Sequence, residues 1–568
     1  MHSRIFLYFL FVTISTFAQP KMETYPKGYF RNPLDIPMNL SGNFGELRTN
    51  HYHMGFDLKT NARENMPVRA AADGYVARIK IEPAGFGRAI YINHPNGYTT
   101  LYAHLNEFDP AIEAYVKEKQ YQAQSWAIQL EIPSGILPVK KGQFIAYSGN
   151  TGGSQAPHLH FEIRRTSDDV NLNPILFGFP LNDHTKPRIM RLGIYDRRYS
   201  VYEQTPKILS AKALGSGLYT AGSGVIIMNT PKISVAITSY DTHDGSANLN
   251  GVFSGTLKFD ERPVSEFIMD NISYDDTRYL NAHIDYRLKQ TAGQYLQHLS
   301  ELPGYVHSIY QSEEKNGILD LSDGRVHSIS IAISDGYNNK SVLNARVQYS
   351  GNESKIPEFE GKQFYPLMLD GFESEYCEFY IPEQGLYDSV YISHLSSPSR
   401  SQQALTDLHR IGNSTVPLQL AMVVRLRPTN NLTPEEQNRT IMQWSSGGKK
   451  AVKKVEWYNG WANAQFRDFG TFQLVLDEQP PVIVPIGFTN GTDFSKSSRL
   501  VFTVRDNFEK FNNVRAEIDG QWIRCSNDKG KTFIYRFDQH FPVGNHVLKI
   551  TAEDEAGNKT ESSYRISR

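Results

Sequence analysis

Short apolar runs that alternate with polar residues, each ended by Gly, Pro, Asn or Asp, recur along this chain of 568 residues. Two of them share one pattern: His327–Asp335 is followed by Asn339-Lys340, and His546–Asp554 is followed by Asn558-Lys559. Successive side chains of a strand point to opposite faces, and Asx residues favour turns. Each run therefore predicts a half-buried strand that ends in a hairpin, and the expected fold class is mainly β.

The chain is too long for one hydrophobic core, so several domains are expected. Polar segments that contain proline are typical linkers, and three occur at 179–187, 350–357 and 477–481. They divide the chain into four blocks: 19–185, 187–352, 353–478 and 479–568. The repeated pattern lies in the second and fourth blocks, and the third block ends in a strand-like run. We expect these last three blocks to be β-sandwich modules.

The N-terminus has the features of a secretory signal peptide. Arg4 precedes an apolar stretch, and the small residues Thr16 and Ala18 have the spacing that signal peptidase recognises. We expect residues 1–18 to be removed, which leaves Gln19 as the first residue. No cysteine follows the stretch as a lipid anchor requires, and no other segment approaches the roughly 20 apolar residues of a membrane span. The sequence predicts an exported protein without a transmembrane anchor, in the periplasm, at the cell surface or outside the cell.

Charge and cysteine content exclude several function classes. The net charge of −1 argues against a dedicated nucleic-acid binder, which normally carries excess or clustered basic residues. The two cysteines, Cys377 and Cys525, are too few for a thiolate zinc site or an iron–sulfur cluster. A disulfide between them and two buried free thiols are equally compatible with the sequence. Any metal must be held by histidines and carboxylates.

The first block carries the local signals of three hairpins and one helix. The expected strand pairs are 67–72 with 75–79, 88–94 with 98–105, and 143–148 with 158–165. Asp-Gly between two strand-like runs favours a tight turn, which supports the first pair. Asp109-Pro110 opens a helix over 109–127, with Ile112, Tyr115 and Val116 at helical spacing. The long segment that contains this helix could form one wall of a groove.

Histidines in three places in this block suggest a metal site. His158 and His160 lie two apart in a predicted strand, so they share one face while Leu159 and Phe161 face the core. His53 and Asp57 flank a glycine turn that could chelate one ion, although a capping Asp beside a surface His is the alternative. His104 ends a strand, where a buried core histidine is the alternative.

These motifs together resemble the lysostaphin-type, or LytM-like, zinc metallopeptidases that cleave peptidoglycan cross-links. The resemblance covers about 42–165, in the family's order. The matching segments are Gly42–Gly45, His53–Asp57, Pro67–Gly74, Gly85–Gly87, Tyr91–His94, Gly97, Tyr102–Leu105, Lys141-Gly142, Tyr147–Gly152 and Pro157–Glu162. The fold it implies is an N-terminal antiparallel β-sheet metallopeptidase domain. The repeat in the later blocks resembles the closing hairpin of bacterial immunoglobulin-like domains, which implies about three β-sandwich modules after the peptidase.

The resemblance implies specific roles for five residues. His53, Asp57 and His160 would bind one Zn²⁺ per chain, and His104 and His158 would be the catalytic histidines. Three protein ligands leave the fourth zinc position open for water, as catalytic zinc sites require. The chain has no His-Glu-x-x-His motif, so a helix-borne glutamate base is not available.

Several readings stay open at this stage. The leading hypothesis is a secreted zinc endopeptidase that hydrolyses peptidoglycan peptides; an inactive peptidase-like envelope protein and a wall-anchored adhesin are the alternatives. Relatives that lose activity lose metal ligands, whereas all five site residues are present here. His51 is expected at the surface and His94 in a turn. The acidic segment 241–248 lacks calcium-loop spacing, so a plain turn is favoured.

Overall fold

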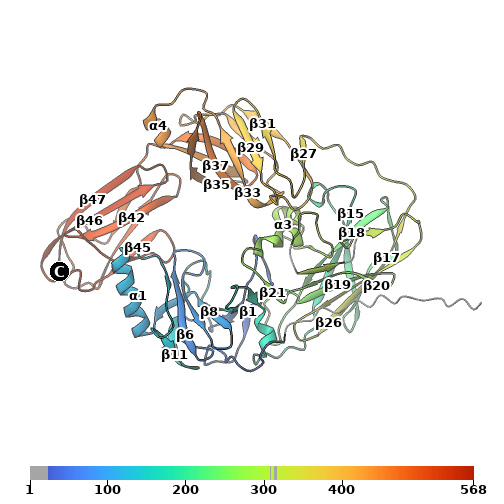
Figure 1. The fold of residues 1–568 in the computed structure, drawn as a ribbon, viewed down its shortest axis with the longest axis horizontal. Coiled ribbons are helices and arrows are strands. Elements are labelled where there is room, and N and C mark those ends of the chain that lie inside the picture. Colours follow the sequence, from blue (N-terminus) through green and yellow to red (C-terminus); the bar gives the residue numbers. More distant parts are fainter. Residues whose placement is uncertain (1–23, 307–308, 313–315) are drawn as a thin grey trace, which may run out of the picture.

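The computed structural model describes residues 24–306, 309–312 and 316–568. The described chain is mainly β, which confirms the predicted fold class, and it contains few helices. The first block and the three later modules follow one another around a ring, and the last module returns to the first block (Figure 1). The predicted signal peptide, residues 1–18, lies outside the described residues. Among the described residues, no helix combines the length and apolar character that a membrane crossing requires.

The first block is built on one large antiparallel sheet. Its strands run in the order β1-β4-β13-β8-β7-β6-β10. Their bounds are Leu40–Gly42 for β1, Phe56–Lys59 for β4, His158–Arg165 for β13, Tyr98–Ala103 for β8, Arg88–Asn93 for β7, Gly74–Ile81 for β6 and Ile128–Glu131 for β10. One face of β13 packs Leu159, Phe161 and Ile163 into the core of this block. The other face carries His158 and His160, as the alternation predicts.

A second, three-stranded sheet packs beside the large one. It has the order β5-β12-β9, with β5 at Pro67–Arg69, β12 at Phe144–Ser148 and β9 at Leu105–Phe108. Of the three predicted hairpins, only the middle one is confirmed, since β7 pairs directly with β8. The other two are wrong. The Asp73-Gly74 turn and the 149–157 loop each lead from the small sheet to the large one, because β5 and β12 pair with each other rather than with β6 and β13.

The predicted helix is α1, Pro110–Ala123, which confirms the sequence signal. Asp109 is its N-cap, and its side chain accepts a hydrogen bond of 3.0 Å from the backbone N–H of Ala111. Ile112 and Val116 face the core of the first block. The helix ends at Gln124, whose φ of 48° is left-handed.

The second module is built on an 11-stranded sheet. Its strands are β15 (Arg188–Asp196), β16 (Lys207–Gly215), β17 (Leu218–Met228), β18 (Lys232–Tyr240), β19 (Ser254–Phe259), β20 (Arg262–Ile268), β22 (Gln297–His298), β23 (Tyr310–Ser312), β24 (Leu319–Asp320), β25 (His327–Ser334) and β26 (Lys340–Tyr349). The repeat forms the hairpin β25–β26, as predicted. Most neighbours are antiparallel, but β17 and β26 run parallel.

The third and fourth modules each pack two sheets against each other. In the third, the sheets have the orders β28-β29-β33-β37-β36 and β31-β32-β38-β34-β35. Their bounds are β28 Asp370–Glu373, β29 Cys377–Ile381, β33 Pro417–Leu426, β37 Trp461–Asp468, β36 Glu456–Tyr458, β31 His394–Ser397, β32 Leu408–Ile411, β38 Gly470–Leu476, β34 Thr440–Ser446 and β35 Lys449–Lys454. Cys377 is buried in this module and Cys525 lies in the fourth; both are free thiols in the structure.

The fourth module closes the chain with the second copy of the repeat. Its sheets are β39-β41-β45-β44 and β40-β47-β46-β42-β43, and the repeat forms the hairpin β46–β47. The bounds are β39 Val482–Ile486, β41 Arg499–Arg505, β45 Thr532–Arg536, β44 Cys525–Ser526, β40 Thr492–Asp493, β47 Lys559–Ser567, β46 Asn545–Asp554, β42 Phe511–Ile518 and β43 Gln521–Trp522.

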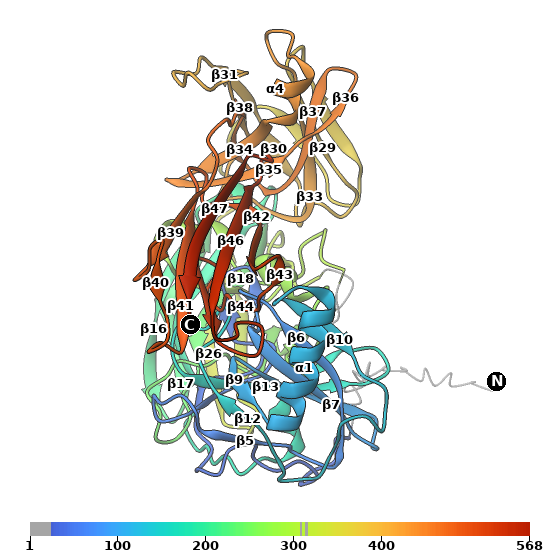
Figure 2. The same ribbon diagram turned by 90° about the vertical axis from the view of Figure 1, so that its left-hand side faces the viewer.

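The first block contacts the second module on one side and the fourth module on the other. Strand β14 (Asn171–Leu172) pairs with β21 (Asn271–Ile272), and Phe44, Tyr52 and Met54 pack into the core of the second module. At the opposite side, α1 lies against the fourth module in both views (Figures 1 and 2). There Tyr121 stacks on His540 with ring centroids 3.8 Å apart, and its hydroxyl donates to Asp538 at 2.5 Å.

Candidate metal centre

Strand register brings the predicted site residues together. In the antiparallel pair β13–β4, His160 lies directly opposite Asp57, and in the pair β13–β8 it lies opposite Ala103, the residue before His104. Opposite residues of an antiparallel pair point to the same face. His158 is on this face too, because it lies two positions from His160. His53 joins the group from the turn that precedes β4.

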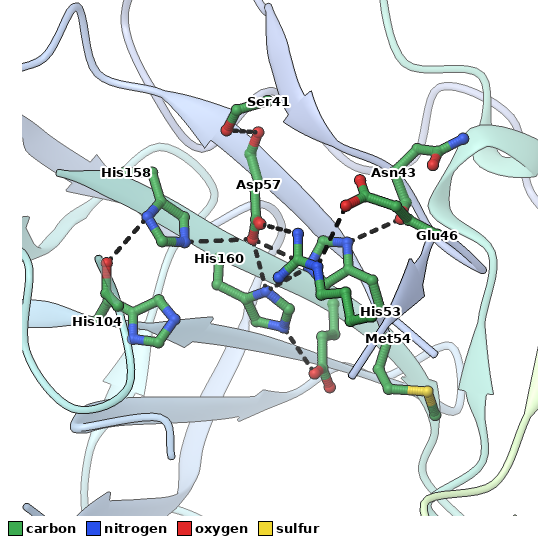
Figure 3. A network of polar contacts seen from close by, with 12 residues as sticks. Ser41, Asn43, Glu46, His53, Met54, Asp57, His104, His158 and His160 are labelled. Atoms are coloured by element: carbon green, nitrogen blue, oxygen red, sulfur yellow. Dashed lines mark hydrogen bonds and ion pairs between the residues drawn. The ribbon is translucent and has the colours of Figure 1, made fainter. Parts of the chain in front are cut away.

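Three side-chain atoms converge at this point, as Figure 3 shows. Asp57 Oδ1 lies 3.0 Å from His53 Nε2 and 2.9 Å from His160 Nδ1, and these two nitrogens are 3.0 Å apart. The three residues are at most 5% exposed. The predicted ligand residues therefore form one compact, buried group.

Each of the three converging residues is oriented by a further partner. His53 Nδ1 donates to the backbone carbonyl of Asn43 at 2.7 Å, which leaves Nε2 without its proton in the neutral ring. The second oxygen of Asp57 accepts a hydrogen bond of 2.5 Å from Arg48. His160 Nε2 contacts Glu162 Oε1 at 2.8 Å. Such outer partners fix the ring orientation and tautomer of metal-binding histidines.

Glu162 is the centre of a second polar group behind His160. Its carboxylate accepts hydrogen bonds from Arg164 at 2.8 Å and from Asn171 at 2.7 Å. The hydroxyl of Tyr274, from the second module, adds one of 2.6 Å. Glu162 is completely buried, so these donors compensate its loss of hydration. Sequence analysis did not predict roles for Arg48, Arg164 or Tyr274, because no local motif marks them.

The two remaining histidines have one nitrogen fixed and the other directed into the site. His104 Nδ1 donates to the carbonyl of Thr151 at 2.9 Å, and His158 Nδ1 to the carbonyl of Ala156 at 2.8 Å. His158 Nε2 lies 3.3 Å from Asp57 Oδ1, and the rings of His104 and His158 are 4.8 Å apart. His104 has a left-handed φ of 59°, which is strained for a residue with a β-carbon.

The loop 149–157, which contacts His104 through the Thr151 carbonyl, packs closely against the turn at 85–87. Gly152 has a φ of 66°, and a β-carbon there would lie 2.3 Å from the backbone nitrogen of Gly87. Only glycine fits this position. The packing sets the position of the neighbouring Thr151 carbonyl, and through it the ring of His104.

Burial and ion pairing shift the pKa values of these residues in different directions. Burial lowers the pKa of His53 to about 4 and that of His104 to about 3. Burial also opposes the charged form of His160, but hydrogen bonds to Asp57 and Glu162 raise its pKa to about 9. Burial acts to raise the pKa of Glu162, yet Arg164 and His160 lower it to about 2. His104 is therefore neutral at pH 7 and can accept a hydrogen bond or a proton.

The group opens into a cleft of about 830 Å³. Asp57, His104 and His158 line it together with Arg48, and Tyr295 reaches it from the second module. None of the described residues that line this cleft belongs to α1, which instead contacts the fourth module. The expectation that this helix forms a wall of this groove is therefore wrong.

Two further histidines are not among the converging residues. His51 is exposed, as expected, and it lines the cleft. His94 follows β7 and is buried; its ring nitrogens lie 2.8 Å from the Asp73 carbonyl and 2.8 Å from Thr100 Oγ1.

The donor set fits a zinc ion. Two neutral imidazole nitrogens and one carboxylate oxygen are common zinc ligands, and atoms that share a tetrahedral zinc lie roughly 3.3 Å apart. The measured separations of 2.9 and 3.0 Å are close to this value. A positive ion between the two histidine nitrogens would also offset the repulsion between their lone pairs.

Comparison with known sequences agrees with this site. The sequence model of peptidase family M23 matches residues 51–127 and 137–174, the segments that contain all five site residues. The N-terminal block is a peptidase family M23 domain. A second match, to the Zu5-like domain, covers residues 369–477 in the third module.

Two relatives and one solved structure illustrate the similarity. The DD-carboxypeptidase/endopeptidase Mpg of Neisseria meningitidis is 35% identical over 140 residues, 25% of this chain and 26% of Mpg. The peptidoglycan DD-endopeptidase ShyA of Vibrio cholerae is 29% identical over 155 residues, 26% of this chain and 30% of ShyA. A zinc-containing peptidase from Vibrio cholerae is 27% identical with a TM-score of 0.19, covering 26% of this chain and 39% of that one. The matches thus span about a quarter of the curated relatives' lengths.

Proposed function

We propose that this protein is an exported zinc endopeptidase that hydrolyses peptide cross-links of peptidoglycan. The observation that carries the proposal is the convergence of His53 Nε2, Asp57 Oδ1 and His160 Nδ1 within 3.0 Å in an M23 domain. The relatives named as peptidoglycan endopeptidases support the substrate class. The presence of all five site residues favours an enzyme over an inactive binding protein.

His53, Asp57 and His160 would hold one catalytic Zn²⁺. When bound, zinc supplies a Lewis acid that polarises a carbonyl and lowers the pKa of water to about 7. His160 is held from behind by Glu162, and Asp57 by Arg48, so the ligands need little reorganisation.

His104 and His158 would perform the proton transfers. Their Nδ1 atoms donate to fixed backbone carbonyls, so the Nε2 atoms face the cleft, where that of His158 lies 3.3 Å from Asp57 Oδ1. One neutral Nε2 can accept a proton from the attacking water, and a protonated ring can donate to the leaving amine. Either ring can also stabilise the charge that develops on the carbonyl oxygen.

Mass spectrometry of digested peptidoglycan tests this function. The chain from Gln19 onward is incubated with purified, cross-linked peptidoglycan, and the released fragments are sequenced. We expect new peptide termini at the cross-links, loss of release with a chelator and recovery with added zinc. Zinc-loaded protein that releases no peptide from any cross-linked peptidoglycan would contradict the proposal.

A further inference from the structure

A second buried group of residues with metal-ligand side chains lies where the first block joins the second module. It consists of Asp183, from the segment that follows the peptidase core, and of Asp241 and His243, which follow β18. One ligand atom from each lies within 4.8 Å of the others. The three residues are 6%, 1% and 5% exposed, so water does not solvate them freely. We call them the junction cluster.

Polar atoms of the junction cluster have no hydrogen-bond partner. These atoms are Asp183 Oδ2, Asp241 Oδ1 and both ring nitrogens of His243. His243 Nδ1 lies 3.0 Å from Asp183 Oδ2, but the geometry forms no hydrogen bond. The other oxygen of Asp183 accepts from the backbone N–H of Thr185 at 2.9 Å, so Oδ2 is the oxygen left for a ligand. Buried polar atoms are nearly always paired, and unpaired ones indicate an ion or water at the site.

Asn250 offers a fourth candidate ligand atom, an amide oxygen. It is 2% exposed, and its Oδ1 also has no partner. Asn250 and Asp241 are antiparallel bridge partners that exchange two backbone hydrogen bonds of 2.9 Å. Side chains of directly opposed residues project from the same face, so the Asn250 amide shares its face with the Asp241 carboxylate.

The electrostatic balance of the cluster also favours a cation. Asp335 lies close enough to interact with both Asp241 and Asp183. Several buried carboxylates around one histidine are costly unless a positive charge compensates them.

The fourth module contains the same arrangement without the histidine. Asn339 Nδ2 donates to the Asp183 carbonyl at 3.0 Å, and Asn558 Nδ2 donates to the Asp477 carbonyl at 2.8 Å. Asp477, Asp506 and Asp554 form the corresponding acidic group. There Phe508 follows Asp506 by two positions, as His243 follows Asp241, and the Asn507 amide donates to Asp477 at 3.0 Å. The imidazole is thus particular to the junction cluster.

We propose that Asp183, Asp241 and His243, with Asn250 Oδ1, form a second metal site that binds a Zn²⁺-class divalent cation. Imidazole nitrogen with carboxylate oxygen is the donor set of zinc and its neighbours, whereas calcium prefers oxygen alone. The sequence analysis favoured a plain turn here because the spacing of 241–248 lacks a calcium loop. The ligands are instead completed by Asp183, which is distant in sequence.

The bound cation would fix the loop that supports the catalytic group. Gly251, at the end of this loop, exchanges two hydrogen bonds with the Asn43 side chain, at 2.8 and 2.9 Å. The Asn43 carbonyl accepts a hydrogen bond from His53 Nδ1. The second site is therefore structural, and it connects the junction of the two blocks to a ligand of the first.

The zinc content of the purified full chain tests this proposal. After dialysis against trace zinc, we expect two zinc ions per wild-type chain and one in His160→Ala. Asp241→Asn and His243→Phe should each hold one, and a variant that combines His160→Ala with His243→Phe should hold none. His243→Phe copies the residue of the fourth module, and Asp506→Asn is the control that should keep two.

The same zinc counts distinguish failure of the junction site from failure of the proposed catalytic site. One zinc per wild-type chain and none in His160→Ala would overturn the junction site but leave the catalytic site intact. Should the junction variants fold poorly, thermal unfolding of His160→Ala decides, because this variant keeps all the junction residues. Zinc should raise its unfolding midpoint, and manganese should raise it less. Stabilisation of His160→Ala by calcium but not by zinc would contradict the role given to His243.

Discussion

The hydroxyl of Tyr274, in the second module, donates a hydrogen bond of 2.6 Å to Oε1 of Glu162, the carboxylate oxygen that contacts His160 Nε2 at 2.8 Å. Tyr274 lies outside the residues that the M23 sequence model matches, and Glu162 connects it to His160, a proposed zinc ligand. Phe44, Tyr52 and Met54 of the first block also pack into the core of the second module. These contacts indicate that the second module is a structural part of the proposed active site.

Substitution of Tyr274 by phenylalanine should weaken zinc binding at the catalytic site. The change removes one hydrogen bond from Glu162 and loosens the orientation of His160. Loss of such an outer partner typically costs about 10- to 100-fold in metal affinity. Competition with a chelator of known affinity measures the effect. Tyr202→Phe is the matched control, because Tyr202 donates one hydrogen bond to the Asn281 carbonyl within the second module; equal affinities in the two variants would refute the link.

Substitution of His104 by alanine should separate turnover from metal binding. His104 is not among the three converging ligand atoms, so the zinc content should stay that of the wild type. Loss of a general acid or base lowers the rate by about 10²- to 10⁴-fold. His53→Ala should lose both catalytic zinc and activity. His546→Ala, in the fourth module, is the control and should keep both; a His104→Ala enzyme with wild-type turnover would remove His104 from the mechanism.

Sequence patterns predicted the parts of the fold and of the site that depend on local spacing. His158 and His160 share a strand face because they lie two apart, and α1 begins at Asp109 because Asp-Pro is a strong helix start. The repeat predicted the hairpins β25–β26 and β46–β47, because alternating apolar residues followed by Asx residues are a local signal as well.

The remaining features depend on long-range contacts. Asp73-Gly74 has the composition of a hairpin turn, but which strands pair is decided by packing between two sheets rather than by the turn. Arg48, Tyr274 and Asp183 carry no motif, and their roles arise from partners far along the chain or in another element.

Zinc affinity of the catalytic site should rise with pH. Because the metal-free pKa of His160 is raised to about 9, this residue is protonated at pH 7 and must release a proton to bind metal. Affinity should therefore increase up to about tenfold per pH unit from pH 7 and level off near pH 9. Chelator competition in the His243→Phe variant, which isolates the catalytic site, measures this slope. Glu162→Gln removes one cause of the raised pKa, so its affinity should level off at lower pH; a flat profile in the parent would contradict the assignment.

Substitution of Lys529 by alanine should slow catalysis without removing zinc. Lys529, in the fourth module, donates hydrogen bonds to the carbonyls of Gly152 and Ser154 at 3.1 and 2.7 Å. This loop also supplies the Thr151 carbonyl that fixes His104. Without the lysine, we expect faster amide hydrogen exchange over residues 151–155 and a several-fold lower kcat, with unchanged zinc content. Lys531→Ala is the matched control, since the Lys531 side chain pairs with the exposed Glu509. Identical exchange and kcat in the two variants would show that the fourth module touches the catalytic loop without ordering it.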